Sequence, residues 1–501
     1  MIIGRAVRKR SLLSSSSLRW ISVCSSEAEV NGKQRVAALW GNGDHGRLGH
    51  GSLESRWTPC PLPSSAFHNQ SLRQIACGGA HTLFLTENGR VYASGLNDYG
   101  QLGVSDDRAY ITEPRGVAGL PKEIVKVSAG YHHSSAITVD GELYMWGKNT
   151  NGQLGLGKMV SEQVLGSVES MATEMQEMLS LLQRMSMEMA NFTIRQDQLE
   201  ASHEQAFKNQ EQALQVLQEA VIDGKRQERD EETPIVTEAA MVLSIPNKVE
   251  CLNGVTIKII SLGFEHSIAV TDKGETLSWG GGRSGRLGHG HQSSIFGLLK
   301  SDSEYTPRLI KELEGLKVKN AAAGMLHSLC ISENGSVHFF GERANKKLGY
   351  SEASNNSVPS MVDELPYSEK AACGGYHTCV ITGGRELYVW GTNENGCLGI
   401  GSTDVAHTPE RVEGPFLRHS VSEVSCGWKH TAAISGGNVY TWGWGGSHGT
   451  FSVDGQSSGG QLGQGNDVDY IKPTKVNFHR HVKALEVSCG FNHTAAILEY
   501  S

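Results

Sequence analysis

The 501-residue sequence predicts an all-β fold, a seven-bladed β-propeller, because three short signals recur seven times in the same order. The first signal, Gly-x-x-His-Ser/Thr, lies between two short apolar runs, which is the pattern of two strands joined by a turn. An aromatic-Gly or Ser-Gly pair and then a Leu-Gly pair follow six of these copies, and both pairs also open the chain. Seven copies of each signal indicate seven structural units.

The histidines of the first signal give the spacing of the units. They are His81, His133, His266, His327, His377, His430 and His493. Successive histidines are 52, 133, 61, 50, 53 and 63 residues apart. A period near 50 with short apolar runs and many glycines is typical of a propeller blade, whereas stacked helix pairs would show a 3.6-residue period. The one long gap indicates an insertion of about 80 residues.

The other two signals show how the chain ends are related. In chain order the first pair is Trp40-Gly41, Ser94-Gly95, Trp146-Gly147, Trp279-Gly280, Phe340-Gly341, Trp390-Gly391 and Trp442-Gly443. The second is Leu48-Gly49, Leu102-Gly103, Leu154-Gly155, Leu287-Gly288, Leu348-Gly349, Leu398-Gly399 and Leu462-Gly463. Neither follows the last histidine phrase. We therefore expect residues around Val36 to Trp40 to pair with the strands around Ala484 to Leu498 and close the ring, which removes exposed sheet edges.

These signals resemble the repeat of the regulator of chromosome condensation family. Its seven-bladed propellers carry Trp-Gly, a Gly-x-Leu-Gly turn and Gly-x-x-His-Thr in their blades. The resemblance covers about residues 36 to 157 and 246 to 499. It implies that these ranges form the two parts of one propeller and that residues 158 to 245 are an insertion and linker.

The insertion predicts a long α-helical coiled coil. From Val168 to Ala220, seam positions repeat every three and four residues for more than seven heptads, enough for a rod of roughly 80 Å. We expect this seam to pair with a partner or to mediate self-association. A lone, partly disordered helix and a segment added by an imperfect gene model are the alternatives. Long insertions in surface loops cost little closure entropy, so the propeller should fold with or without this one.

Residues 1 to 26 are typical of an organelle transit peptide. They contain five basic residues and a serine run but no acidic residue, and they lack the unbroken apolar core of a secretory signal. The basic residues crowd the first ten positions, which favours the mitochondrial matrix, with the plastid as second choice. The net charge of −8 becomes −13 once those five positive charges are removed.

Composition argues against a general nucleic-acid binder and against a membrane span. Nucleic-acid affinity depends largely on Lys and Arg contacts to phosphates, which an acidic chain lacks overall. Local basic loops, Lys346-Lys347 or His479 to Lys483, could still contact RNA. No apolar run approaches 18 residues, so no transmembrane helix is expected.

Four of the ten cysteines directly precede the glycine of the histidine phrase: Cys77, Cys373, Cys426 and Cys489. The same slot holds Ala129, Leu262 and Ala323 in the other copies. A slot that takes Ala, Leu or Cys is a small-to-medium buried position. We therefore expect free buried thiols in a reducing compartment rather than disulfides.

The sequence predicts no catalytic, cofactor or metal site. Cys-Gly-x-x-His occurs four times, but each copy belongs to a different blade and three copies lack the cysteine. Gly41-x-Gly43-x-x-Gly46 matches a dinucleotide fingerprint, yet a turn rather than a helix follows it. The seven repeat histidines are interpreted as structural residues whose ring nitrogens join neighbouring blades.

The resemblance also raises photoreception, because the plant ultraviolet-B photoreceptor of this family carries Gly-Trp-Arg-His-Thr in consecutive blades and uses the stacked tryptophans as its chromophore. Only Gly427 to Thr431 is close to that phrase here. The slot of Trp428 holds Gly79, Tyr131, Phe264, Met325, Gly375 and Phe491 in the other copies. One tryptophan cannot form the cluster, so photoreception is not expected. Trp442 and Trp444 are expected to pack between blades.

The resemblance implies a non-enzymatic scaffold. Organelle-directed members of the family are associated with mitochondrial RNA processing, ribosome assembly and respiratory-complex biogenesis. We therefore expect the propeller face to bind proteins or ribonucleoproteins, with the coiled coil as a second contact. The alternative is guanine-nucleotide exchange on a small GTPase, as in the founding member, although no motif here carries that activity over. Nuclear chromatin association is a third possibility, opposed by the acid-free N-terminus and the acidic remainder.

Overall fold

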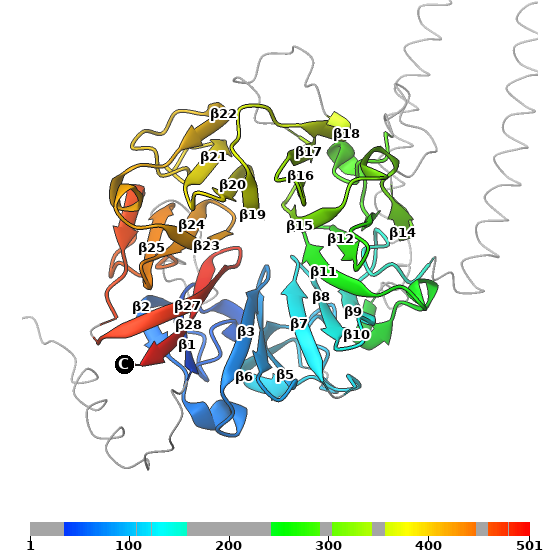
Figure 1. Ribbon diagram of the computed structural model, residues 1–501. Coiled ribbons are helices and arrows are strands. Elements are labelled where there is room, and N and C mark those ends of the chain that lie inside the picture. The colour runs from blue at the N-terminus through cyan, green and yellow to red at the C-terminus, as the bar shows by residue number, and fades with distance from the viewer. Residues whose placement is uncertain are drawn as a thin grey trace, which may run out of the picture.

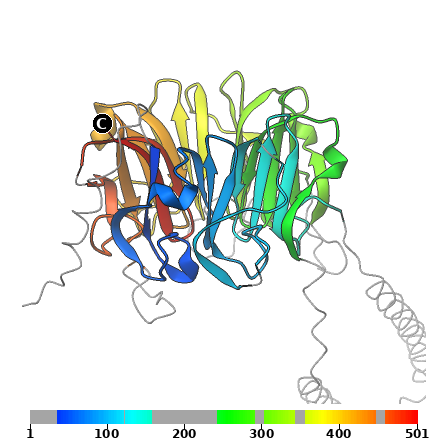
Figure 2. The same ribbon diagram turned by 90° about the horizontal axis from the view of Figure 1, so that it is seen from below.

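The computed structural model describes residues 35–157, 242–290, 303–342, 356–446 and 459–500, apart from residues 107, 122 and 479. These residues form seven four-stranded sheets arranged as blades around a central axis (Figure 1). Seen edge-on, the sheets stand side by side in a ring (Figure 2). The predicted all-β, seven-bladed propeller is therefore confirmed. The predicted transit peptide and coiled coil lie outside the described residues.

We number the blades 1 to 7 and give the strands of each from the axis outward. Blade 1 contains β27 (Val482–Cys489), β28 (His493–Tyr500), β1 (Arg35–Gly41) and β2 (Arg56–Pro61). Blade 2 contains β3 (Leu72–Cys77), β4 (His81–Thr86), β5 (Val91–Leu96) and β6 (Tyr110–Gly116). Blade 3 contains β7 (Ile124–Ala129), β8 (His133–Thr138), β9 (Leu143–Lys148) and β10 (Val242–Lys248). Blade 4 contains β11 (Ile257–Leu262), β12 (His266–Thr271), β13 (Thr276–Gly280) and β14 (Glu304–Leu309); blade 5 contains β15 (Val318–Ala323), β16 (His327–Ser332), β17 (Val337–Gly341) and β18 (Asn356–Met361). Blade 6 contains β19 (Ser368–Cys373), β20 (His377–Thr382), β21 (Leu387–Gly391) and β22 (Ala406–Arg411); blade 7 contains β23 (Val421–Cys426), β24 (His430–Ser435), β25 (Asn438–Gly443) and β26 (Tyr470–Lys475). Short 3-10 turns lie in the loops: η2 (Asp44–Gly46), η3 (Ser64–Phe67), η5 (Glu250–Leu252), η6 (Arg283–Gly285), η7 (Lys311–Leu313) and η8 (Gly414–Leu417).

The hydrophobic core lies between the blades. The second strand of a blade, such as β4, is buried along its whole length, because both of its faces pack against side chains of a sheet rather than against water. One cluster joins Leu83 and Leu85 of β4 to Ile124 and Val127 of the next blade. Each blade therefore buries apolar side chains against its neighbours in the ring.

The outermost strand of every blade carries a proline. These residues are Pro59, Pro114, Pro246, Pro307, Pro359, Pro409 and Pro473. Each outermost strand also shows a register shift against its neighbour. Proline has no N–H to donate and is tolerated at a sheet edge, where it discourages pairing with another chain.

The two ends of the chain meet in blade 1. Its strand order is β2-β1-β28-β27, so the sheet combines the first two and the last two strands of the chain. β1 and β28 are antiparallel, with Ala38 opposite Ala496 and Trp40 opposite Thr494. Backbone hydrogen bonds between the chain ends therefore complete the ring.

The insertion leaves and re-enters one sheet. Lys148 of β9 lies opposite Val242 of β10, so residues 149–241, which include the insertion, connect two paired strands of blade 3. β10 begins at Val242, before the boundary expected at residue 246. The later start was predicted because the repeat pattern appeared to resume at Ile245-Pro246. Because β10 is an edge strand, it accommodates Pro246 in its interior.

Candidate functional site

A histidine-to-hydroxyl bond joins each blade to the next, and at the junctions of Trp146, Trp279 and Trp442 the hydrogen-bond chain uses all three sequence signals. Between blades 2 and 3, the Nε2 atom of His81 and the Oγ atom of Ser134 lie 2.9 Å apart. The Ser134 hydroxyl donates to the Gln101 carbonyl at 2.7 Å, and the indole N–H of Trp146 donates to the same carbonyl at 2.9 Å. Gln101 directly precedes Leu102-Gly103. We call this arrangement a blade junction.

The direction of these bonds fixes the tautomer of the histidine. A serine hydroxyl has one proton, and Ser134 donates it to the Gln101 carbonyl. Its oxygen must then accept the Nε2–H of His81. A histidine that donates to the hydroxyl cannot take that hydroxyl's proton, so the pair does not form the nucleophile and base of a catalytic dyad.

The seven repeat histidines all lie at blade junctions. The other Nε2-to-hydroxyl distances are 2.9 Å for His493 and Thr82, 3.3 Å for His133 and Ser267, 2.8 Å for His266 and Ser328, 3.0 Å for His327 and Thr378, 2.9 Å for His377 and Thr431, and 3.0 Å for His430 and Thr494. Burial lowers the pKa of four of these rings to about 3, that of His327 to about 4, and those of the other two well below the usual value. The rings are therefore neutral at physiological pH.

The glycine that opens the histidine phrase leaves room for the imidazole behind it. A Cβ atom on Gly427 would lie 2.2 Å from Cε1 of His430 and 2.7 Å from the carbonyl oxygen of Gly490. The ring is held by its bond to Thr494 and the carbonyl belongs to the next blade, so neither can move freely.

The substitution Gly427→Ala is expected to lower the free energy of unfolding by about 3 kcal/mol, because the extra methyl overpacks a blade junction. Gly116→Ala is the matched control, since a Cβ atom there would meet nothing within 4 Å. We expect it to change stability by less than about 0.5 kcal/mol. Urea unfolding of the two variants beside the unmodified protein tests this, and equal midpoints for both variants would contradict the steric argument.

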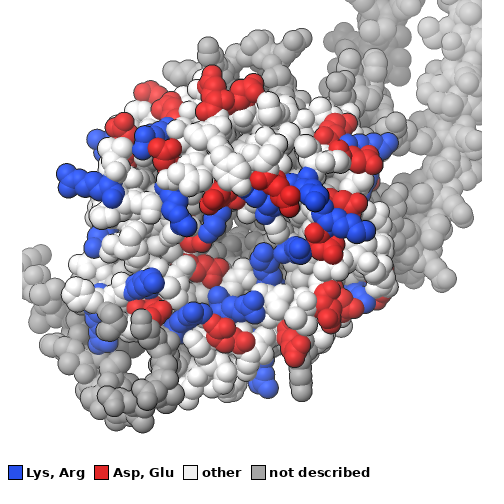
Figure 3. Space-filling model, in the orientation of Figure 1, with Lys and Arg blue, Asp and Glu red and all other residues white. Residues whose placement is uncertain are grey.

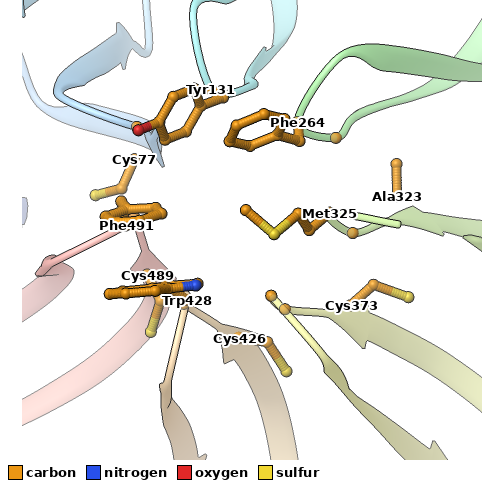
Figure 4. A pocket seen from close by; sticks show the side chains of 18 of the residues that line it. Cys77, Tyr131, Phe264, Ala323, Met325, Cys373, Cys426, Trp428, Cys489 and Phe491 are labelled. Carbon is orange, nitrogen blue, oxygen red and sulfur yellow. The ribbon is translucent and has the colours of Figure 1, made fainter. Parts of the chain in front are cut away.

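The residues that follow these glycines form the rim of one mouth of the central channel. They are Gly79, Tyr131, Phe264, Met325, Gly375, Trp428 and Phe491, and they line a cavity of about 100 Å³ (Figure 4). The rings of Trp428 and Phe491 are stacked, with centroids 4.4 Å apart, and those of Tyr131 and Phe264 lie 4.1 Å apart. The Nε1 atom of Trp428 is buried, has no hydrogen-bond partner among the described residues and points towards the centre of the opening (Figure 4).

The two glycines of the rim make room for their neighbours. A Cβ atom on Gly79 would lie 2.8 Å from the Tyr131 ring, and one on Gly375 would lie 2.6 Å from the Trp428 ring. From the sequence, these positions were interpreted only as missing aromatics. The available signal was the glycine that stands one blade before Tyr131 and the one that stands one blade before Trp428. Trp428 also meets Trp444 edge-on at 5.7 Å, whereas Trp442 is fully buried between blades.

Farther along the inner strands, one equivalent position carries mostly polar side chains. It holds Gln74, Lys126, Ile259, Asn320, Lys370, Glu423 and Glu486. Lys370 forms an ion pair with Glu423, and burial raises the pKa of Glu486 to about 8. Acidic and basic side chains also alternate around the central opening on the face shown in Figure 3. Charge of mixed sign does not favour a polyanion such as RNA.

The nine described cysteines are free thiols. His377, Cys379 and Cys426 come from adjacent blades, and their donor atoms lie within 4.8 Å of one another. No sequence signal predicted this proximity. His377 Nε2 is bonded to Thr431, and burial raises the pKa of Cys426 well above its usual value, which disfavours the thiolate that a metal ion requires. We therefore interpret the group as packing residues.

Thiol labelling should follow these environments. At pH 7.5 we expect N-ethylmaleimide to modify Cys251, which is exposed, at least about 10-fold faster than Cys330 or Cys489. Those two are buried, and burial raises the pKa of each to about 12. Peptide mapping by mass spectrometry gives the order of modification, with urea-unfolded protein as the control. Rapid modification of Cys330 in the folded protein would show that its thiol is not buried in the way the blade packing requires.

No described helix is long and apolar enough to cross a bilayer. The closed ring and its seven histidine junctions define the class of protein, a seven-bladed propeller with equivalent links between blades. The chain belongs to the regulator of chromosome condensation (RCC1) repeat family. The RCC1-like domain matches residues 223–496, and the RCC1 repeat matches residues 39–85, 88–137 and 140–170.

Two relatives and one solved structure are similar to this chain. The ultraviolet-B receptor UVR8 of Arabidopsis thaliana is 27% identical over 457 residues, which cover 90% of this chain and 78% of the receptor. The mitochondrial RCC1 domain-containing protein RUG3 of Arabidopsis thaliana is 27% identical over 408 residues, covering 79% of this chain and 72% of RUG3. The crystal structure of Prp20p from Saccharomyces cerevisiae superimposes with a TM-score of 0.64 at 18% identity, covering 94% of this chain and 93% of that one, which supports the fold alone.

Proposed function

We propose that the protein is a non-enzymatic propeller scaffold in mitochondria. It binds protein or ribonucleoprotein partners in organelle RNA processing, including splicing, in ribosome assembly or in respiratory-complex biogenesis. The observation that carries the proposal is the channel mouth, whose rim is a cluster of aromatic side chains around a cavity of about 100 Å³, with the hydroxyl of Tyr131 as a polar group. Aromatic side chains with one polar group are typical of protein contact sites.

Two features support the organelle. The similar protein RUG3 is a mitochondrial protein. Residues 1 to 26 of this chain also have the basic, acid-free composition of a transit peptide. The full chain fused at its C-terminus to a fluorescent protein should enter mitochondria, and the fusion lacking residues 1 to 26 should not. Import into plastids, or unchanged distribution after the deletion, would count against this part of the proposal.

The scaffold itself is tested by affinity capture of the tagged protein from isolated mitochondria, with proteins and crosslinked RNA identified together. Recovery of RNA-processing or ribosome-assembly factors with specific transcripts is the expected result. The same capture with residues 159–240 deleted asks whether the insertion contributes, because the deletion leaves the pairing of Lys148 with Val242 intact. Loss of those factors on deletion would assign their binding to the insertion rather than to the propeller.

The second candidate is guanine-nucleotide exchange on a small GTPase. Prp20p, which shares the propeller fold, binds Gsp1p and histones. Faster release of labelled GDP from a mitochondrial GTPase in the presence of the purified protein would favour exchange. Capture of such a GTPase alone, preferring its nucleotide-free form, would displace the scaffold proposal.

A further inference from the structure

The central channel contains a second cavity beside the one at its aromatic mouth. Its volume is about 250 Å³, and the innermost strands of blades 7, 1, 2, 3 and 4 line it. Cys77, Ala129 and Cys489 line both cavities, so the second begins where the mouth cavity ends and follows the inner strands away from the mouth. Its polar side chains are those of Gln74, Lys126, Ser128, Ser425, Glu486 and Ser488. We call this cavity the polar chamber.

Three of these side chains use an acceptor atom to join neighbouring blades. The Oε1 atom of Gln74 accepts a backbone N–H of blade 3 at 2.9 Å. The hydroxyl oxygen of Ser488 accepts a backbone N–H of blade 2, and that of Ser425 accepts one of blade 1, both at 2.9 Å. These bonds fix the side chains at the inner edges of the sheets, where strand N–H groups need a partner.

The donor atoms of the same three side chains remain unused. An amide that accepts through its oxygen still has two N–H donors, and a hydroxyl that accepts still has one proton to donate. Within the part of the chain that the structure describes, Gln74, Ser425 and Ser488 make no side-chain hydrogen bond as donors. Because all three line the polar chamber, these side chains offer it hydrogen-bond donors.

The polar chamber also has a cation without a carboxylate partner. The Nζ atom of Lys126 donates to the backbone carbonyl of Lys258 at 3.3 Å, and none of the ion pairs between described residues includes it. Burial lowers the pKa of this ammonium group, and no nearby carboxylate opposes the shift. Glu486 lines the chamber from blade 1, where it accepts the backbone N–H of Ile75. Burial raises its pKa to about 8, so at pH 7 the carboxyl is uncharged and has a proton to donate.

We propose that the polar chamber binds a small oxyanion, either a carboxylate or inorganic phosphate, through the ammonium of Lys126, the amide of Gln74 and the serine hydroxyls of blades 7 and 1. Anionic oxygens form the strongest hydrogen bonds with such donors. Gln74, Lys126 and Glu486 are each partly exposed, so solvent reaches the chamber. Its volume is several times the roughly 30 Å³ of one water molecule, which leaves room for such an ion and some hydration water. The inference goes beyond the scaffold function and does not depend on it.

The inference is tested on the purified full-length protein at pH 7 and constant ionic strength with two probes. Acetate binding is followed by saturation-transfer proton NMR, and binding of inorganic phosphate by its phosphorus-31 linewidth. We expect saturable binding of at least one of the two ions. Binding of acetate alone would identify a carboxylate as the ligand, and binding of phosphate alone would identify a phosphate.

Gln74→Glu should weaken this binding by about 10-fold or more, because it places a negative charge beside the anion. The new carboxylate can still accept the N–H of blade 3. Asn320→Asp is the matched control. Asn320 stands at the equivalent position of blade 5, and its Oδ1 atom accepts the backbone N–H of Ala371 at 3.0 Å, but it does not line the polar chamber. Its affinity should stay within about twofold of that of the unmodified protein.

Lys126→Met removes the cation while keeping a long side chain, and it should also weaken binding by about 10-fold or more. Lys370→Met is its control. Lys370 stands at the equivalent position of blade 6 but is paired with Glu423 and does not line the polar chamber. Circular dichroism establishes that each variant is folded. If Lys126→Met does not fold, Gln74→Glu decides the question, because it keeps its bond to blade 3.

Three results would overturn the inference. The first is that neither acetate nor phosphate binds the unmodified protein in a saturable way. The second is that the affinity is unchanged in both Gln74→Glu and Lys126→Met, which would place the bound ion elsewhere on the protein. The third is that Gln74→Glu and Asn320→Asp weaken binding equally, which would show a general effect of added negative charge rather than a site in the polar chamber.

Discussion

Lowering the pH from 7.5 to 5 is expected to unfold the propeller cooperatively. The repeat histidines have folded-state pKa values of about 3 to 4, or well below the usual value, whereas an unfolded histidine titrates near 6.5. Their contribution to stability is complete above about pH 6.5 and is lost as the pH falls, because only the unfolded chain then binds the protons. Each ring can cost up to about 1.4 kcal/mol per pH unit.

One acidic group acts in the opposite direction. The pKa of Glu486 is raised to about 8 in the folded protein, so between pH 8 and about 4.5 the folded state binds the extra proton and gains stability as the pH falls. The loss of stability from the seven histidines exceeds the gain from the one glutamate. The net loss between pH 6.5 and 5 is comparable to the whole stability of an ordinary domain, about 5–15 kcal/mol.

Melting temperatures followed by circular dichroism at pH 7.5, 6.5, 5.5 and 5 measure this effect. His430→Gln is the control, because its amide N–H can still donate to Thr494 while one titrating group is lost. The number of protons taken up on unfolding, obtained from the slope of stability against pH, should fall by about one. A melting temperature that is the same at pH 7.5 and pH 5 would mean that the buried histidines become charged without disrupting the blade junctions.

The sequence was sufficient to predict the ring because the repeated signals meet where neighbouring blades are joined. His81 bonds to Ser134, and Ser134 and Trp146 both donate to the Gln101 carbonyl, so the histidine phrase and the Leu-Gly turn depend on each other, whereas Ser94 and Phe340 replace the tryptophan in two blades. That physical dependence is what makes the period visible in a single sequence. The prolines of the outer strands repeat as strictly, yet their role is apparent only when the strands are placed at sheet edges.

The candidate site was less predictable, because it depends on contacts between residues that are far apart in the sequence. Gly79 is a rim residue because Tyr131 of the next blade covers it. The stacking of Trp428 on Phe491 becomes visible only when blade 7 is placed beside blade 1, which combines strands from both ends of the chain.

Removing residues 483–501 is expected to abolish cooperative folding. β28 lies inside blade 1 between β27 and β1, and it faces β1 from Arg35 to Gly41. Its loss would expose the edge of β1 together with Leu39 and Trp40, which are fully buried in the closed ring. It would also remove His493 and with it the junction to Thr82 of blade 2. Differential scanning calorimetry should show no two-state transition for the truncated chain.

Deleting residues 159–240 provides the control, because it removes a longer segment but leaves both paired strands of blade 3 in place. Its melting temperature should stay within a few degrees of that of the full chain, because loop length contributes only weakly to closure entropy. Comparing the two deletions separates the effect of lost strand contacts on the melting temperature from the effect of a shorter chain. If the truncated chain instead melts cooperatively at the temperature of the full protein, six complete blades are stable as an open array, and the pairing of β1 with β28 does not hold the ring together.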